Sequence, residues 1–195
     1  MRLLASTLVF ILVASAAHAE KFMIDPSHTG IQFQVPHLVV SKVKGRFDKF
    51  EGGFDFDEKT MKLDNVMVTI HTDSVNTNQA DRDKDLRSPN FLEVTKYPKI
   101  EFKSTKTIYE KDKPKKIEGN LTIHGVTKKV ILDVDYKGAV TDPGENRRVA
   151  FEAETQGNRK DFVLKWNQAL EAGGFVVGDD VKISIDGEAI AATKK

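Results

Sequence analysis

The chain has 195 residues, a formal net charge of +1 at pH 7 and no cysteine. This length suits one domain with a sizeable hydrophobic core. The balance of acidic and basic residues leaves no electrostatic footprint for a phosphate backbone or an anionic bilayer surface, so we expect no nucleic-acid partner. Without cysteine, the chain cannot form disulfides, thiolate metal sites or a thiol nucleophile.

The N-terminal segment has the features of a secretory signal peptide. Met1-Arg2 supplies a positive start, residues 3–17 are mostly apolar, and Ala17-His18-Ala19 is a small-x-small triplet that precedes signal-peptidase cleavage. The apolar run is interrupted by Ser and Thr and is shorter than the about 20 residues that span a bilayer. We therefore expect cleavage after Ala19, a mature domain over residues 20–195, no stable membrane insertion and a periplasmic location, with export to the medium as the alternative.

Apolar and polar residues alternate with a period of two along most of the remaining chain. The alternation occurs at residues 31–35, 66–70, 100–102, 121–123, 130–134, 151–153 and 181–185. Turn signals rich in Gly, Pro and Asp separate these segments, at residues 52–53, 57–60, 111–114, 142–144 and 173–174. One apolar face per strand is typical of antiparallel sheets, so we predict an all-β sandwich or barrel of eight to ten strands.

One highly charged segment breaks this alternation. Asn78 can cap a helix that runs to about Ser88, with Asp81 and Asp83 in the early turns, where the helix dipole favours negative charge. Pro89 ends the helix. It is either a solvated crossover between strands or a lid over one end of a barrel. A second short helical piece is predicted over residues 166–172.

The sequence contains no motif for catalysis or metal binding. The mature-chain histidines, His28, His37, His71 and His124, lie in separate segments without compact metal-ligand spacing. There is no nucleophile elbow, phosphate loop or dinucleotide fingerprint. We therefore expect no metal, no cofactor and no enzyme activity. An alternative lipid-modifying enzyme would use His28 or His37, which flank one predicted strand.

Five stretches, in this order, resemble the YceI-like family of periplasmic proteins. They are DPSHTGIQFQVPHLVVSKVKGRFDKFEGGFDFD (25–57), DRDKDLRSPNFLEVTKYPKIEFKST (81–105), GNLTIHGVTKKV (119–130), RKDF (159–162) and VGDDVKISIDGEA (177–189). Asp85 stands where the family pattern has histidine, and Val163 where it has glycine. The resemblance covers nearly all of the mature chain, and these departures concern polar contacts near a ligand's head.

The resemblance implies a lipocalin-like antiparallel barrel of about eight strands, with one short helix between strands and a long apolar lumen. It also implies a long-chain lipid as ligand: a polyisoprenoid, a quinone, or a fatty acyl chain or amide. Our leading hypothesis is a periplasmic lipid carrier. The alternatives are a lipid-modifying enzyme, a protein that sequesters lipophilic toxic compounds, and an interaction module with a packed lumen. For the assembly we consider a homodimer.

The predicted ligand-binding residues fall into two groups. The lumen wall is expected to comprise Phe33, Val35, Phe54, Phe56, Val68, Ile70, Phe102, Phe151 and Phe162. The polar head of the ligand is expected near Arg82, Arg87, Arg159 and Asp161, with His28, His37 and a stacking Trp166 as further candidates. A register error of one residue would invert every side chain of a strand, so the sequence does not determine which face of each strand lines the lumen. For each charged residue the alternative is a purely structural ion pair.

Overall fold

The computed structural model describes residues 19–171 and 173–192. The predicted signal peptide, apart from Ala19, therefore lies outside the described residues. The described strands are β1 (Glu20–Ile24), β2 (Gly30–His37), β3 (Ser41–Phe47), β4 (Phe50–Asp57), β5 (Lys62–His71), β6 (Val75–Asn76), β7 (Lys99–Glu110), β8 (Lys113–Ile123), β9 (Val126–Thr141), β10 (Arg147–Asn158) and β11 (Asp180–Ala191). The helical elements are α1 (Ala80–Arg87) and the 3₁₀ turns η1 (Thr72–Ser74) and η2 (Arg159–Phe162).

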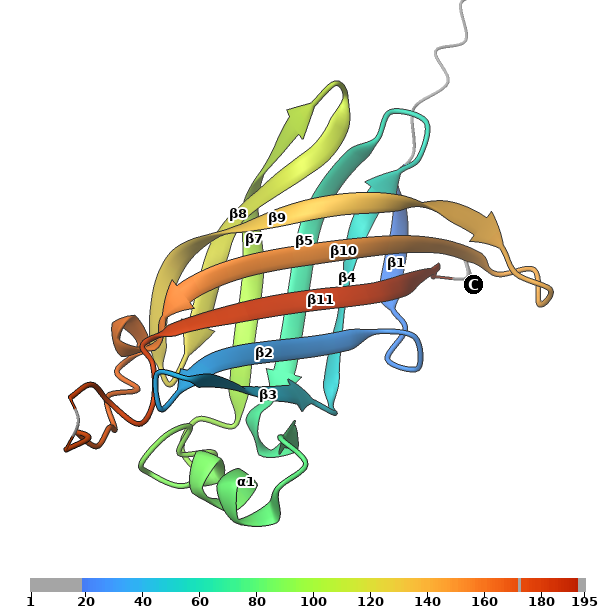
Figure 1. The fold of residues 1–195 in the computed structure, drawn as a ribbon. Coiled ribbons are helices and arrows are strands. Elements are labelled where there is room, and N and C mark those ends of the chain that lie inside the picture. Colours follow the sequence, from blue (N-terminus) through green and yellow to red (C-terminus); the bar gives the residue numbers. More distant parts are fainter. Residues whose placement is uncertain (1–18, 172, 193–195) are drawn as a thin grey trace, which may run out of the picture.

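Eight of the strands close into an antiparallel barrel (Figure 1). Their order around it is β1-β4-β5-β7-β8-β9-β10-β11, and the pairing of β1 with β11 completes the ring. The strands β2, β3 and β6 continue the sheet from β11 as an extension. The prediction of an all-β barrel of about eight strands with one short helix is confirmed, and the sandwich alternative is wrong.

The strands β1 and β2 share β11 as a partner. β1 pairs with residues 189–191 of β11, and β2 pairs with residues 182–186. The intervening residues 25–29 therefore carry the chain from the closed barrel to the extension. The backbone N–H and C=O groups of β1 and β2 thus form hydrogen bonds with different parts of β11. This shared pairing allows the barrel to close beside the added β2–β3 hairpin.

A cluster of charged side chains fixes this passage between β1 and β2. The Arg148 guanidinium lies 2.8 Å from the carboxylate of Asp25, 2.7 Å from that of Asp142 and 3.2 Å from that of Glu188. The Nδ1 atom of His28 lies 2.8 Å from Asp25 Oδ2. Hydrogen bonds from Arg148 and His28 hold the pKa of Asp25 well below its usual range, and Arg148 with the adjacent turn lowers the pKa of Asp142 to about 2.

Replacing Arg148 with leucine is expected to lower the free energy of unfolding at neutral pH, because Asp25 and Asp142 lose their shared cation. Both carboxylates have folded-state pKa values below those of the unfolded chain. Their stabilisation is therefore complete above about pH 4 and is lost as the pH falls through the folded values. The difference in the free energy of unfolding between the wild type and the variant should therefore become smaller at acid pH. Urea unfolding at several pH values measures this difference.

The exposed ion pair of Lys137 with Asp135 provides the control. Lys137→Leu should leave the free energy of unfolding nearly unchanged, because exposed pairs contribute little. If the loss of unfolding free energy in Arg148→Leu stays constant from neutral to acid pH, the role assigned to the cluster is wrong.

The helix α1 begins one residue later than predicted. Its N-cap is Gln79, whose side chain accepts a hydrogen bond from the backbone N–H of Arg82. Asn78 instead has a left-handed backbone (φ 58°), and its N–H donates to the side chain of Asn76. The predicted cap at Asn78 is therefore wrong, because this residue forms the preceding turn, a conformation that asparagine adopts readily. The predicted end holds, since α1 ends at Arg87, before Pro89.

The helical piece predicted over residues 166–172 is not observed. Residue 172 lies outside the described residues, residues 164–168 are irregular, and Ala169 forms an isolated bridge with Phe175. The nearest helical element is η2, which precedes this loop. The helix does not form because the backbone groups of this segment have other partners: the Trp166 carbonyl accepts from Arg159, the Gln168 carbonyl accepts from the N–H of Val176, and the N–H of Leu170 donates to the carbonyl of Gly174.

Gly52 and Gly53 lie inside β4 rather than in the predicted turn. A Cβ atom on Gly52 would lie 2.4 Å from the carbonyl oxygen of Met67, and one on Gly53 would lie 2.4 Å from that of Phe22. The pairing of β4 with β5 shifts register between Gly53 and Asp55. The two glycines therefore allow close approach of neighbouring strands at a bulge.

Candidate functional site

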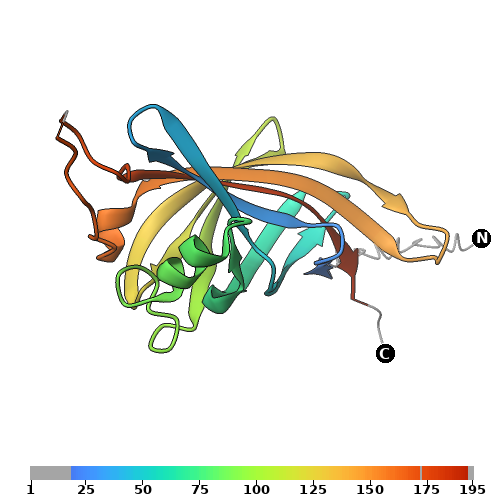
Figure 2. The same ribbon diagram turned by 60° about the horizontal axis from the view of Figure 1, so that its bottom comes forward.

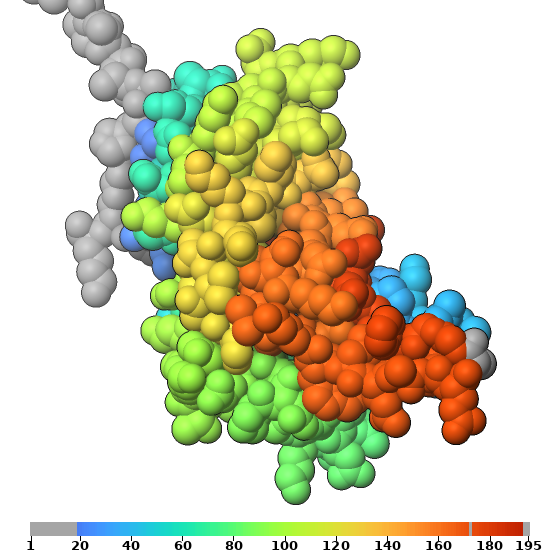
Figure 3. All heavy atoms as spheres, turned by 90° about the vertical axis from the view of Figure 1, so that its left-hand side faces the viewer, coloured from blue at the N-terminus to red at the C-terminus, as the bar shows by residue number. Residues whose placement is uncertain are grey.

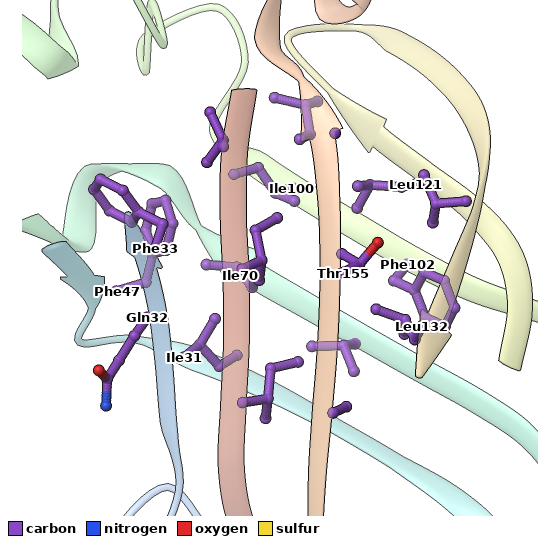
Figure 4. Close-up of a pocket in the computed structure, with 18 of the residues that line it drawn as sticks. Ile31, Gln32, Phe33, Phe47, Ile70, Ile100, Phe102, Leu121, Leu132 and Thr155 are labelled. Carbon is purple, nitrogen blue, oxygen red and sulfur yellow. The ribbon is translucent and has the colours of Figure 1, made fainter. Parts of the chain in front are cut away.

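The barrel encloses a cavity of about 550 Å³. Its wall consists mainly of apolar side chains from the barrel strands and from the extension formed by β2, β3 and β6. Figure 4 shows Ile31 of the extension beside Ile70, Ile100, Leu121 and Leu132 of the barrel. The volume lies within the about 300–1,000 Å³ that is typical of small-molecule sites. The protein's own side chains therefore do not fill the lumen, in contrast to the packed lumen expected of a pure interaction module.

The structure places all the predicted wall residues in the cavity lining. These are Phe33, Val35, Phe54, Phe56, Val68, Ile70, Phe102, Phe151 and Phe162. Alternation along a strand explains the arrangement: Val66 and Val68 line the cavity, whereas Met67 between them is 50% exposed. The lining also includes Ile31 and Ile100, which have the parity of the predicted Phe33 and Phe102, and Leu121 and Leu132 on strands where no wall residue was predicted. The alternation noted in the sequence could have identified all four.

The helix α1 lies across one end of the barrel (Figure 2). Asp81, Arg82, Asp85 and Leu86 of this helix line the cavity, and so does Phe91 in the loop that follows. Of these residues, Arg82 was a predicted site residue, and Asp85 was noted as a departure from the family pattern near a ligand's head. Alternation along strands carries no information on a helix that packs against the end of a barrel, so Asp81, Leu86 and Phe91 were not predicted as lining residues.

Two contacts hold this helical cover in place. Arg87 lies outside the lining, and its Nε and Nη2 atoms donate hydrogen bonds to the carbonyl oxygens of Asp73 (2.7 Å) and Val75 (2.6 Å). The ring of Phe91 lies 5.2 Å from the ring of Trp166, and both side chains line the cavity. Arg87 thus anchors α1 to η1 and β6 instead of facing the lumen, while Trp166 joins the cover to the loop after η2.

Arg82 is an exposed cation at the N-terminal end of α1. Its Nε and Nη2 atoms donate to the side chain and the backbone carbonyl of Thr77, at 2.8 and 3.0 Å. The Thr77 backbone N–H in turn donates to the buried carboxylate of Asp83 at 2.8 Å. Within the described residues Nη1 of Arg82 has no hydrogen-bond partner, so this donor is available to a ligand. Asp81 and Asp85 of the same helix also line the cavity.

Arg159 is a buried arginine, only 5% exposed, that orders the loop after η2. Its Nε atom donates to the carbonyl oxygen of Gly178 at 2.9 Å. Its two Nη atoms bind the carbonyl oxygens of Leu164, Trp166 and Val177 and the carboxylate of Asp179. Burial lowers the pKa of Arg159, and Asp179 opposes this effect. Although Arg159 borders the cavity, these partners occupy every N–H donor of its guanidinium, so none is left for a ligand.

The remaining polar candidates occupy different places. Asp161 is exposed on η2 outside the lining, and the side chain of His28 is 57% exposed and bonded to Asp25 outside the lining. His37, at the end of β2, lines the cavity, but no carboxylate in the described part of the chain binds its side chain. The two features that the enzyme alternative needs, a cavity position and a carboxylate partner, therefore lie on different histidines.

Within residues 19–171 and 173–192, no group of three or more His, Asp or Glu side chains is arranged to hold a metal ion. The same residues include no helix with the length and apolar character that a membrane crossing requires.

Comparisons with known proteins agree with this architecture. Residues 22–189 match the family described as YceI-like domain. Protein YceI of Salmonella newport is 44% identical over 188 residues, which cover 95% of this chain and 96% of the relative. The crystal structure of the Campylobacter jejuni YCEI protein has a TM-score of 0.71 and 29% identity, over 81% of this chain and 90% of that one.

A more distant structure has the same fold. A polyisoprenoid binding domain from Saccharophagus degradans, implicated in plant cell wall breakdown, has a TM-score of 0.63 and 15% identity, over 90% of this chain and 100% of that one. At this identity the likeness concerns the fold alone. The family match and the close relatives decide the classification: the chain belongs to the YceI-like family.

Proposed function

We propose that this protein is a periplasmic carrier that holds one long-chain lipid in the lumen of its barrel. The observation that carries the proposal is the cavity of about 550 Å³ with a mainly apolar wall. Each methylene buried in such a site contributes about 0.8 kcal/mol, so about ten would contribute roughly 8 kcal/mol before the cost of ordering the chain. A hydrocarbon tail is thus the ligand that gains most from this lumen.

The chemistry of the ends of the cavity supports a ligand with a small polar head. Arg82 offers the Nη1 donor described above, whereas Arg159 is saturated by its protein partners. The Saccharophagus degradans domain of the same fold is named for polyisoprenoid binding. We therefore propose a polyisoprenoid or quinone, or a fatty acyl chain or amide, as the ligand class for this chain. The proposed periplasmic location rests on the signal peptide predicted over residues 1–19.

The test is to identify what the protein carries when it is isolated from its own cell envelope. Purified protein is extracted with organic solvent, and the extract is examined by mass spectrometry. We expect one isoprenoid or acyl species in near-stoichiometric amount, and an intact chain that begins at Glu20. Protein that is ligand-free on isolation and takes up no long-chain lipid from vesicles would contradict the carrier role.

A further inference from the structure

An exposed cluster of apolar side chains lies at one end of the molecule. It comprises Leu38, Val39 and Val40 in the β2–β3 turn and Phe175 in the loop after η2, which are 39%, 74%, 87% and 53% exposed. A Cβ atom on Gly174 would lie 3.1 Å from a methyl group of Val39, so the two segments touch. Figure 3 shows the loop and the hairpin side by side on this face. We call these four residues the apolar tip.

The backbone conformation of the β2–β3 turn is unfavourable for the apolar residues at positions 38 and 39. Leu38 and Val39 have left-handed backbones, with φ of 52° and 65°. Left-handed conformations suit Gly, Asn and Asp, and a β-branched residue there is an outlier that costs about 1–2 kcal/mol. The turn would therefore be more stable with small polar residues. An apolar turn that is both strained and solvent-exposed indicates a function for its side chains.

The apolar tip adjoins residues that line the cavity. The backbone N–H of Leu38 donates to the carbonyl oxygen of Val176 at 2.9 Å, and His37 forms a bridge with Val177. His37, Val176 and Val177 all line the cavity. A hydrophobic surface that receives the tip would thus lie next to the lumen, and a lipid tail could pass between them over a short distance.

Although the chain as a whole is close to neutral, exposed basic side chains occur on the two segments that carry the apolar tip. Lys42 and Lys44 on β3 and Lys165 in the loop after η2 are exposed, and none of the three forms an ion pair within the described residues. Lys160, which is paired with Asp179, lies 5.8 Å from the ring of Phe175. Glu171 is an exposed acidic residue on the same loop. Exposed apolar side chains flanked by unpaired lysines match the chemistry of an anionic bilayer surface.

We propose that the apolar tip docks the protein on the surface of an anionic lipid bilayer. Val39, Val40 and Phe175 enter the interface between head groups and acyl chains, and the flanking lysines face the lipid phosphates. In this orientation the part of the cavity lined by His37, Val176 and Val177 lies next to the bilayer, which is where a carrier would exchange its lipid. The purpose of docking rests on the proposed function, but docking itself is measurable without any ligand.

The first experiment is cosedimentation of the full mature protein with vesicles of phosphatidylglycerol and phosphatidylethanolamine. The test variant combines Leu38→Asn, Val39→Gly and Val40→Thr, which suit the left-handed turn and should not lower the unfolding midpoint. We expect partitioning into vesicles to fall about tenfold. The matched control is Val140→Thr, an exposed valine (60%) at the far end of β9, away from the apolar tip in Figure 1. This variant should bind vesicles like the wild type.

The second experiment separates the charge contribution. Lys42→Gln and Lys44→Gln should each lower partitioning by about fivefold on anionic vesicles and have little effect on phosphatidylcholine vesicles. Wild-type protein that does not sediment with vesicles, or a tip variant that sediments like the wild type, overturns the proposal. A wild-type dimer that the tip variant dissociates, without vesicle binding, overturns it in favour of a protein interface.

The outcomes also separate docking from carriage. Protein that retains an extractable lipid but does not sediment refutes docking and leaves the carrier intact. Protein that sediments through the apolar tip but neither contains nor takes up lipid supports docking and refutes the carrier.

Discussion

Arg159→Leu is expected to lower the free energy of unfolding by about 3 kcal/mol, the cost typical of removing a buried, fully bonded charge. The side chain is only 4% exposed, and the carbonyl oxygens of Leu164, Trp166 and Gly178 would lose their donor. The loop after η2 would then lose the centre around which it is ordered. Urea unfolding measures the first effect, and amide hydrogen exchange of residues 163–178 measures the second.

Lys160 supplies a matched control for Arg159. It is the next residue in the chain and binds the same carboxylate, with 2.7 Å between its Nζ atom and Asp179 Oδ2, but its side chain is 44% exposed. Lys160→Ala should therefore leave stability nearly unchanged. If Arg159→Leu instead folds with normal stability and loses affinity for lipid, Arg159 binds the ligand's head group and the structural role assigned to it is wrong.

Val68→Trp is expected to reduce the bound lipid at least about tenfold while the protein remains folded. Val68 lines the cavity, and an indole in its place would occupy space that the tail needs. Met67→Trp is the control, because the adjacent side chain is 50% exposed on the outer face of the same strand. The measurement is the amount of lipid extracted per protein, with thermal unfolding recorded for both variants.

A second lumen variant keeps this prediction testable if Val68→Trp does not fold. Ile183→Phe adds less bulk from β11, on a different strand of the cavity wall. We expect it to reduce the bound lipid in the same direction. Normal lipid content in a folded lumen variant and in Met67→Trp alike would place the ligand outside the barrel.

The sequence predicted which residues of a strand share one face, because a strand presents alternate residues to opposite faces. Phe33 and Val35 on β2, and Val68 and Ile70 on β5, show this directly, since all four line the cavity. The glycine pair in β4 is a case in which the sequence pattern predicted the wrong local structure. Gly52 and Gly53 have the composition of a turn, and only the neighbouring strands reveal that they allow close backbone approach.

The charged candidates illustrate the harder part of the site. In the sequence, nothing distinguishes Arg82, Arg87 and Arg159, which all lie in charged stretches. In the structure, Arg82 lines the cavity and Arg87 anchors α1, whereas every N–H donor of the Arg159 side chain is bonded within the protein. The partners that separate them are mostly backbone carbonyls. Every residue has such a carbonyl, so the sequence carries no mark of which ones an arginine will bind.

The sequence by itself determined the β-structure, the family resemblance and the apolar face of each strand, because these depend on local alternation and on residues near one another in the chain. Only the tertiary structure decided that β1 pairs with β11 to close the barrel and that the lumen stays open under α1. It also decided that an apolar tip lies beside residues of the cavity lining. These features arise from contacts between segments far apart in the chain. Their free energy depends on how strands and loops meet in space, which no local pattern encodes.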